Sequence, residues 1–202
     1  MPRSAAARVL GVHWGFLMRN DRLATRFRAR GFTLFEMIVT IVIVAVLAAI
    51  ALPNFGSSLR NNRMTTETND LLTAFNLART EAVTRAAPVS VCASSDGATC
   101  ATASTAWAQG WMVFVDYGTP GQVDAADGDV VLRVWSKIDP KDSISADAVF
   151  LRYSMTGTVS DGGAVSQSTF RLSPHGCTGD QERQITIKTM GRAESQHVTC
   201  GT

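Results

Sequence analysis

The chain has 202 residues, of which 46% are hydrophobic and 18% are charged, and its formal net charge is +2. This length fits one domain with an appendage, and the hydrophobic share is too high for a disordered protein. Seven of the 19 basic residues but only one of the 17 acidic residues precede Gly31, so positions 32–202 hold 12 basic and 16 acidic residues. Their net charge of about −4 excludes an overall attraction for nucleic-acid phosphates, and any such role requires a local patch.

The first 31 residues contain seven arginines and precede the most apolar stretch of the chain. Basic residues beside an apolar segment stay in the cytoplasm, so they predict that everything after Pro53 is exported. Translation from Met1 and translation from Met18 both remain open, since Met18 lies much closer to Gly31.

An apolar segment follows the basic one. The sixteen residues from Met37 to Leu52 are interrupted by Thr40 alone, and Pro53 comes next. As a helix, Phe32–Leu52 spans about 31 Å and matches the hydrocarbon core of a bilayer. This segment therefore predicts a single transmembrane helix.

A secretory signal peptide is the alternative for the same segment. The sequence from Ala48 to Ala51 has the small residues of a cleavage site, but the apolar region of a signal peptide is shorter. Glu36 argues against this alternative, because a carboxylate near the start of an apolar run costs several kcal/mol unless it is paired or neutralised. We therefore interpret Glu36 as a functional residue.

Gly31, Phe32 and Glu36 together resemble the N-terminal motif of the type IV pilin-like family. The resemblance implies that a prepilin peptidase cuts between Gly31 and Phe32 and methylates the new amino group of Phe32. It also implies that Glu36 pairs with the Phe32 amine of a neighbouring subunit, because opposite charges neutralise one another in a low dielectric. Pro53 fits the family too, as a residue that loosens or kinks the packed stem.

Residues 54–87 predict a second, amphipathic half of the same helix, which Pro88 ends. Spacings of three and four place its apolar residues on one face, interpreted as the packing face for the rest of the domain: Phe55, Leu59, Leu71, Leu72, Phe75, Ala78 and Ala82.

From position 88 onward, short apolar and β-branched runs separated by Gly, Ser and Asp predict strands. These runs are Val89–Ala93, Trp111–Val115, Val130–Trp135, Val149–Tyr153, Thr169–Leu172 and Gln184–Thr189. A long helix packed on an antiparallel sheet is the α+β layering that follows, and it is the pilin-like fold. The segments Gly110–Asp116, Arg171–Gly176 and Thr189–Arg192 resemble the GspH/FimT branch of the family.

The domain organisation predicted from these patterns has four parts. A basic leader, 1–31, is removed; 32–53 is the transmembrane and assembly half of the helix; 54–87 is its amphipathic half; and 88–202 is a β-rich periplasmic head.

The cysteines, Cys92, Cys100, Cys177 and Cys200, all lie on the predicted exported side, where disulfides persist. We expect the pairs Cys92 with Cys100 and Cys177 with Cys200, although the sequence permits three pairings. A zinc site is the alternative, because His175-x-Cys177 and His197-x-x-Cys200 offer four possible ligands for that ion.

One other group of residues resembles a metal site. The carboxylates of Asp116, Asp124, Asp127 and Asp129 resemble a loose calcium loop, but their spacing fits no EF-hand and favours solvated turn residues. No nucleophile elbow, phosphate loop or zinc-protease motif is present in the sequence, so we expect neither an enzyme nor a metal or other cofactor.

The resemblance implies a minor pilin or pseudopilin of the inner membrane that assembles into a type IV pilus or a type II secretion pseudopilus. Its expected partners are other pilins, the prepilin peptidase and the assembly platform, and its expected final place is a filament or pilus tip. The alternative is a pilus-tip DNA receptor, in which Arg183, Lys188 and Arg192 grip phosphates. Glu194 stands where DNA-binding members of the branch carry a second arginine.

Overall fold

The computed structural model describes residues 31–160 and 167–201. They belong to two compact units, whose boundary in the sequence lies between Val46 and Leu47. Except for Gly31, the predicted leader lies outside the described residues. These described residues form one long helix followed by nine strands and two short 3-10 helices.

The long helix, α1, extends from Leu34 to Arg85 and contributes to both units. It ends where the sequence predicts, because Ala86 adopts a positive φ of 50° and Pro88 cannot continue the helix. The amide of Ala87 donates to the carbonyl of Ala82 and satisfies one of the last helical acceptors.

One face of α1 is buried in the second unit. Its buried apolar residues follow the spacing of three and four residues that an amphipathic helix requires: Met64, Leu71, Ala74, Phe75, Ala78 and Ala82. The predicted packing face is therefore confirmed over this range. Leu59, which we had placed on it, is 57% exposed, so the buried face begins one turn later.

Five strands form an antiparallel sheet in the order β3-β2-β1-β5-β6. Their bounds are β1 Val89–Ala93, β2 Gly110–Val115, β3 Val130–Ser136, β5 Phe150–Tyr153 and β6 Val159–Ser160. β1 and β2 are buried along their full length, which explains why both read as continuous apolar runs.

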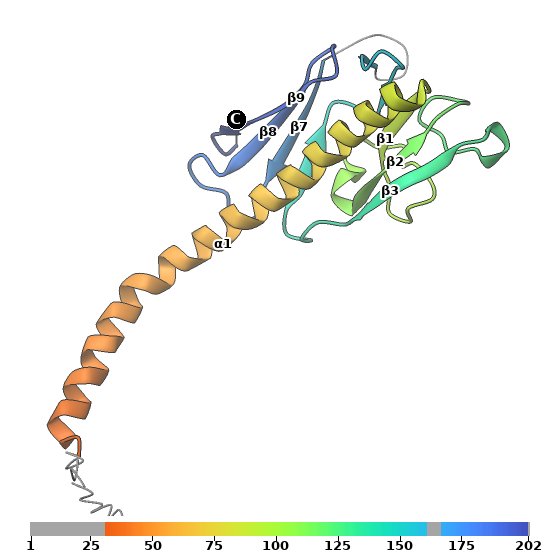
Figure 1. The fold of residues 1–202 in the computed structure, drawn as a ribbon. Helices are drawn as coiled ribbons and strands as arrows, with labels where there is room; N and C mark the ends of the chain where they lie inside the picture. The colour runs from red at the N-terminus through yellow and green to blue at the C-terminus, as the bar shows by residue number, and fades with distance from the viewer. Residues whose placement is uncertain (1–30, 161–166, 202) are drawn as a thin grey trace, which may run out of the picture. The chain divides into compact units, whose positions relative to one another are not determined.

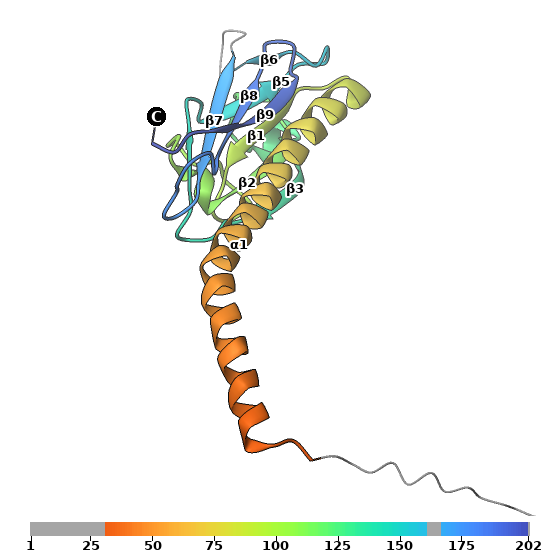
Figure 2. The same cartoon turned by 90° about the vertical axis from the view of Figure 1, so that its left-hand side faces the viewer.

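A second antiparallel sheet has the order β4-β7-β8-β9. Its strands are β4 Ser143–Ala146, β7 Ser168–Ser173, β8 Glu182–Ile187 and β9 Ala193–Val198. The predicted antiparallel β-sheet head is therefore divided into two sheets. Figures 1 and 2 show the C-terminal half of α1 lying along both sheets.

An aromatic cluster joins the helix to the two-sheet head. The ring centroid of Phe75 in α1 lies 6.4 Å from that of Trp107 and 4.9 Å from that of Phe170 in β7. Trp107 belongs to the 3-10 helix η1, Ala106–Gln109, and its ring meets that of Phe170 edge-on at 4.8 Å. Offset and edge-on contacts of this kind add to the stabilisation that burial provides.

Replacing Phe75 by alanine removes the central ring of this cluster. We expect Phe75→Ala to lower the free energy of unfolding by about 3–5 kcal/mol, because it leaves a cavity between α1 and β7. Urea unfolding of the full chain in detergent, followed by tryptophan fluorescence, measures the loss. Leu59→Ala is the matched control on the exposed part of the same helix, and equal stability of the two variants would contradict the assignment of the core.

Candidate functional site: the N-terminal stem and the polar groups of the head

The residues of the predicted cleavage motif precede the helix. Gly31, Phe32 and Thr33 are not helical, and the Phe32 side chain is 75% exposed. A Cβ atom added at Gly31 would meet no atom within 4 Å, so the fold itself does not require glycine at this position. The reason for a glycine here therefore lies outside the packing of the described chain.

Thr33 and Glu36 begin α1 as a capping pair. The backbone amide of Glu36 donates to the hydroxyl oxygen of Thr33 at 3.2 Å, which satisfies one of the unpaired amides of the first turn. The carboxylate of Glu36 also lies near the positive end of the helix dipole. The sequence contains this signal as Thr33-x-x-Glu36, although the predicted elements did not include it.

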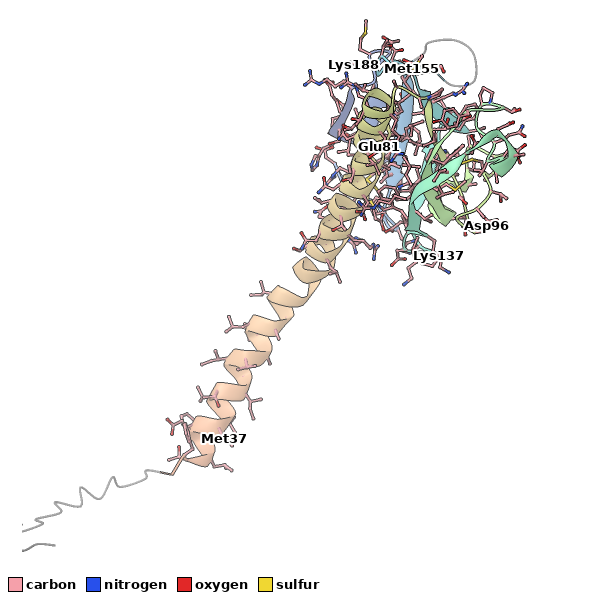
Figure 3. All side chains as sticks on the ribbon, turned by 45° about the vertical axis from the view of Figure 1, so that its right-hand side comes forward. Met37, Glu81, Asp96, Lys137, Met155 and Lys188 are labelled. Carbon is pink, nitrogen blue, oxygen red and sulfur yellow. A yellow bond between two sulfur atoms is a disulfide. The ribbon has the colours of Figure 1, made fainter. Side chains whose placement is uncertain are left out.

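The first seventeen residues of α1 carry large apolar side chains on all sides, as Figure 3 shows around Met37. Their exposed fractions range from 38% for Val39 to 82% for Leu34. A helix that is apolar around its whole circumference requires lipid or other helices to cover it. Within the described residues, none of the helices satisfies the combined criterion of length and apolarity for crossing a membrane.

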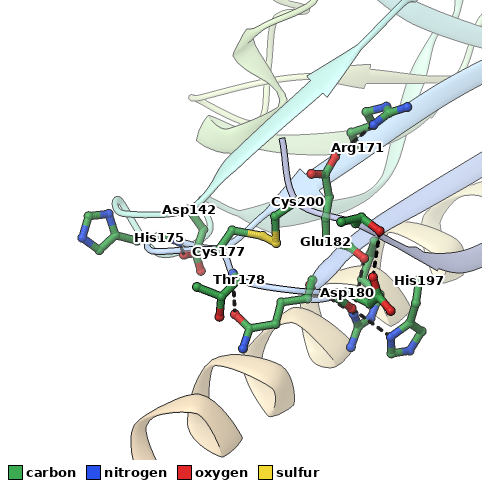
Figure 4. The surroundings of a disulfide bond; sticks show 12 residues. Asp142, Arg171, His175, Cys177, Thr178, Asp180, Glu182, His197 and Cys200 are labelled. Carbon is green, nitrogen blue, oxygen red and sulfur yellow. Dashed lines mark hydrogen bonds and ion pairs between the residues drawn. A yellow bond between two sulfur atoms is a disulfide. The ribbon is translucent and has the colours of Figure 1, made fainter. Parts of the chain in front are cut away.

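The structure contains both expected disulfides. Cys92 in β1 bonds to Cys100, and Cys177 bonds to Cys200, with Cα–Cα distances of 5.6 and 5.7 Å. Figure 4 shows the second bond between the loop after β7 and the segment after β9. The sulfur atoms are joined to one another, so the cysteines do not offer the thiolates that a zinc site needs.

The two histidines near this bond have other neighbours. His197 Nδ1 lies 3.3 Å from the carbonyl oxygen of Asp180, and the backbone amide of His175 donates to Asp142 at 2.9 Å. Over residues 31–160 and 167–201, no group of three or more His, Cys, Asp or Glu side chains is arranged to hold a metal ion.

The aspartates between β2 and β3 organise the backbone of their own loop. Asp129 accepts from the amides of Tyr117 and Asp124 at 2.7 and 2.9 Å. Asp124 caps the short helix η2, Ala125–Asp127, by accepting from Ala126. These bonds give the carboxylates a structural role as turn residues.

Asp116 closes the base of the same loop. It is fully buried, accepts from Ser90 and from the amide of Gly121, and lies 3.5 Å from the guanidinium of Arg152. Burial raises the pKa of Asp116, and the hydrogen bonds and Arg152 oppose that rise.

The three cations of the proposed DNA patch have different surroundings. Arg183 is 6% exposed and donates to the carbonyls of Asp180 and Gln181 at 3.3 and 3.0 Å. Lys188 and Arg192 both contact Glu194, at 2.8 and 3.1 Å. The DNA-receptor alternative stays a prediction, with two of its cations beside an acid and the third bonded to a loop.

Gly191, next to Arg192, is required by the turn between β8 and β9. Its φ is 75°, and a Cβ atom here would lie 2.0 Å from the carbonyl oxygen of Gly157. This glycine therefore has a structural reason that is independent of any ligand.

Two family models match the chain. The model described as "Type II transport protein GspH" matches residues 67–191, and the model described as "Prokaryotic N-terminal methylation motif" matches residues 26–52. The chain belongs to the GspH family. Subunits of this pilin-like family are not enzymes and assemble with other pilins into filaments, which agrees with our expectation of a non-enzymatic subunit.

The fold of this GspH-family chain is similar to that of FimU, a type IV minor pilin of Pseudomonas aeruginosa. The two share 18% sequence identity with a TM-score of 0.51, over 67% of this chain and 89% of FimU. EpsH, a minor pseudopilin of the Vibrio cholerae type 2 secretion system, matches at 13% identity and a TM-score of 0.45, over 69% of this chain and 99% of EpsH. No curated protein matches significantly. The predicted pilin-like α+β fold and the GspH/FimT branch are confirmed.

The Cys177–Cys200 bond encloses β8 and β9, and the two bonded cysteines are separated by 23 in sequence number. In the chain-entropy account, replacing both cysteines by serine lowers the free energy of unfolding by about 3 kcal/mol, because the unfolded chain gains freedom. Thermal unfolding of the full chain measures this loss, with the Cys92–Cys100 bond left intact in the variant. Unchanged stability would show that the bond does not constrain the unfolded chain.

Proposed function

We propose that this chain is a minor pilin or pseudopilin subunit, inserted once in the inner membrane and then assembled into a type IV pilus or type II secretion pseudopilus. The observation that carries the proposal is the apolar surface on all sides of α1 from Leu34 to Ile50. Lipid covers such a surface before assembly, and the helices of other subunits cover it afterwards.

The proposed division of the chain follows from this surface. Residues 1–31 are a leader that the prepilin peptidase removes, and 32–53 span the membrane and pack in the filament. Residues 54–87 attach the stem to the head, and 88–202 form a periplasmic head that contacts other subunits. The arginines before Gly31 support this orientation, because positive residues remain in the cytoplasm.

Glu36 is the proposed docking residue that joins the incoming subunit to the growing filament. Its side chain is exposed beside Phe32 in a segment that is otherwise apolar. Pairing with the amino group of a neighbouring subunit's first residue removes the cost of a carboxylate in a low dielectric. Pro53 is proposed to adjust the stem during packing.

Processing is tested by mass spectrometry of the N-terminal peptide from membranes of cells with and without the prepilin peptidase. We expect a chain that begins at N-methylated Phe32 only when the peptidase is present. An uncut chain, or one cut after Ala49 or Ala51, would refute the proposal and identify a plain anchored or secreted protein.

The role of Glu36 is tested apart from its role in capping. Glu36→Gln keeps a side chain that suits the capping position but removes the charge, and we expect normal membrane insertion with loss of incorporation into filaments. Thr33→Ala is the matched variant, which removes the capping bond at a cost of about 1 kcal/mol and keeps the carboxylate. Immunoblots of membranes and of sheared filaments compare the two.

Equal incorporation of Glu36→Gln and the unaltered chain would contradict a docking role for the charge. Loss of incorporation in both variants would instead assign the defect to the start of the helix. Assays of surface pili and of secreted proteins in a strain that lacks this chain then distinguish a pilus subunit from a secretion pseudopilin.

A further inference from the structure

Arg63 of α1 is the cation that joins the helix to the segment between the two sheets. This crossing segment, residues 137–142, connects β3 of the first sheet to β4 of the second. The guanidinium of Arg63 donates to both carboxylate oxygens of Asp142, at 2.6 and 3.0 Å, and to Asp139 at 3.0 Å. A planar guanidinium that binds one carboxylate through two bonds is held in one orientation. These contacts therefore fix α1 to the crossing segment.

Asp142 extends this connection to a third part of the head. Its side chain has no exposed surface, and the oxygen that accepts from Arg63 at 3.0 Å also accepts from the backbone amide of His175 at 2.9 Å. His175 lies in the loop that follows β7, next to Asp142, as Figure 4 shows. The helix, the crossing segment and this loop therefore meet at one buried carboxylate.

Glu67 is a third acid beside Arg63, one turn further along α1. It is 8% exposed; one carboxyl oxygen accepts a long bond of 3.4 Å from the amide of Asp139, and the other has no hydrogen-bond donor among the described residues. Three carboxylates thus surround one guanidinium, and they cannot all be neutralised by it. A buried carboxyl group with so few donors favours its neutral form.

Arg63 and Glu67 are four positions apart on the same helix, a separation that brings two side chains to one face. Glu81 and Arg85 have the same separation on α1, and there the carboxylate and the guanidinium are in contact. Arg63 instead donates across to the crossing segment. It therefore has two alternative sets of acceptors, one outside the helix and one within it.

We propose that Arg63 is a pH-dependent latch, which holds α1 to Asp139 and Asp142 when Glu67 is neutral and turns to Glu67 when Glu67 is ionised. The physical reason is competition, because a third charged carboxylate attracts the guanidinium and repels the two carboxylates that it binds. Release of Arg63 leaves the buried Asp142 with fewer donors, which is unfavourable and loosens the crossing segment and the loop of His175.

The charged groups around Glu67 set the pH at which the latch opens. They lie on α1, on β3 and in the crossing segment: Arg63, Asp70, Arg133, Lys137, Asp139 and Asp142. Burial raises the pKa of Glu67 to about 7, opposed by the Asp139 amide and reinforced by the Asp142 carboxylate. The latch is therefore closed below pH 7 and opens as pH rises through 7. Because the proposed function exports the head, the latch would respond to external pH; only that consequence rests on the proposed function.

The same titration acts on stability. An acid whose pKa is higher in the folded chain takes up a proton on folding, so the free energy of unfolding falls as pH rises from about 4.5 to about 7 and then levels off. Burial also raises the pKa of Asp116, so the comparison with Glu67→Gln isolates the contribution of Glu67. We expect Glu67→Gln to unfold at a higher temperature than the unaltered chain at about pH 8, and the difference to shrink towards about pH 5.

NMR of the full isotope-labelled chain in detergent micelles tests the change of partner directly. We expect the carboxyl carbon of Glu67 to titrate near pH 7 and the Nε–H signal of Arg63 to change with the same midpoint. In Glu67→Gln the Arg63 signal keeps its low-pH position from about pH 5.5 to about pH 8.5. Glu81→Gln is the matched control, because it removes the partner of Arg85 on the same helix and leaves the change at Arg63 in place.

Hydrogen exchange measures whether the crossing segment loosens. The His175 amide donates to Asp142, and its protection is expected to fall severalfold between about pH 6 and about pH 8, after correction for the intrinsic exchange rate. The Tyr117 amide donates to Asp129 at 2.7 Å, outside this cluster, and is the internal control that keeps its protection. In Glu67→Gln the His175 amide is expected to be equally protected at both pH values.

Three results would overturn the proposal. A midpoint for Glu67 below about pH 5 would show that it is already ionised while Arg63 binds the crossing segment. A midpoint near pH 7 with unchanged Arg63 and His175 signals would show burial without a change of partner. Persistence of those changes in Glu67→Gln would assign them to another titrating group. None of these outcomes depends on processing or filament assembly, so the proposed function is tested separately.

Discussion

One apolar stripe on α1 holds together two sheets whose strands share no ladder in the described chain. Each sheet has an inner face that needs covering, and the stripe from Met64 to Ala82 covers both. Phe75 is the central contact, since its ring meets η1 on one side and β7 on the other. The head and the second half of the helix are therefore one folding unit, and neither has a complete core alone.

Local sequence patterns predicted the strands that are rich in apolar and β-branched residues. β1 and β2 are buried throughout, and their apolar runs are visible without any tertiary information. β9 was missed, because its residues are mostly exposed and polar, and only the pairing with β8 defines it as a strand. The split into two sheets was also missed, since β1 pairs with β5 across more than fifty intervening residues, a choice that tertiary contacts make.

The candidate sites divide in the same way. Gly31, Phe32 and Glu36 lie within six positions of one another, so their motif can be recognised in the sequence alone. A pocket between α1 and the first sheet, lined by Glu67, Trp111 and Trp135 among others, forms only when a helix packs across two paired strands. The charge pattern was predictable only in part. The sequence places Glu194 near the basic residues, but its contacts with Lys188 and Arg192 depend on the β8–β9 hairpin.

The Cys177–Cys200 bond has a mechanical consequence. β9 is the edge strand of its sheet, so tension on the segment that follows it would otherwise peel it from β8 one residue pair at a time. The disulfide closes a covalent ring that contains both strands and places the load on the sulfur atoms first. The hairpin then yields only by shearing many hydrogen bonds together, so a head built in this way resists pulling on the segment that follows β9.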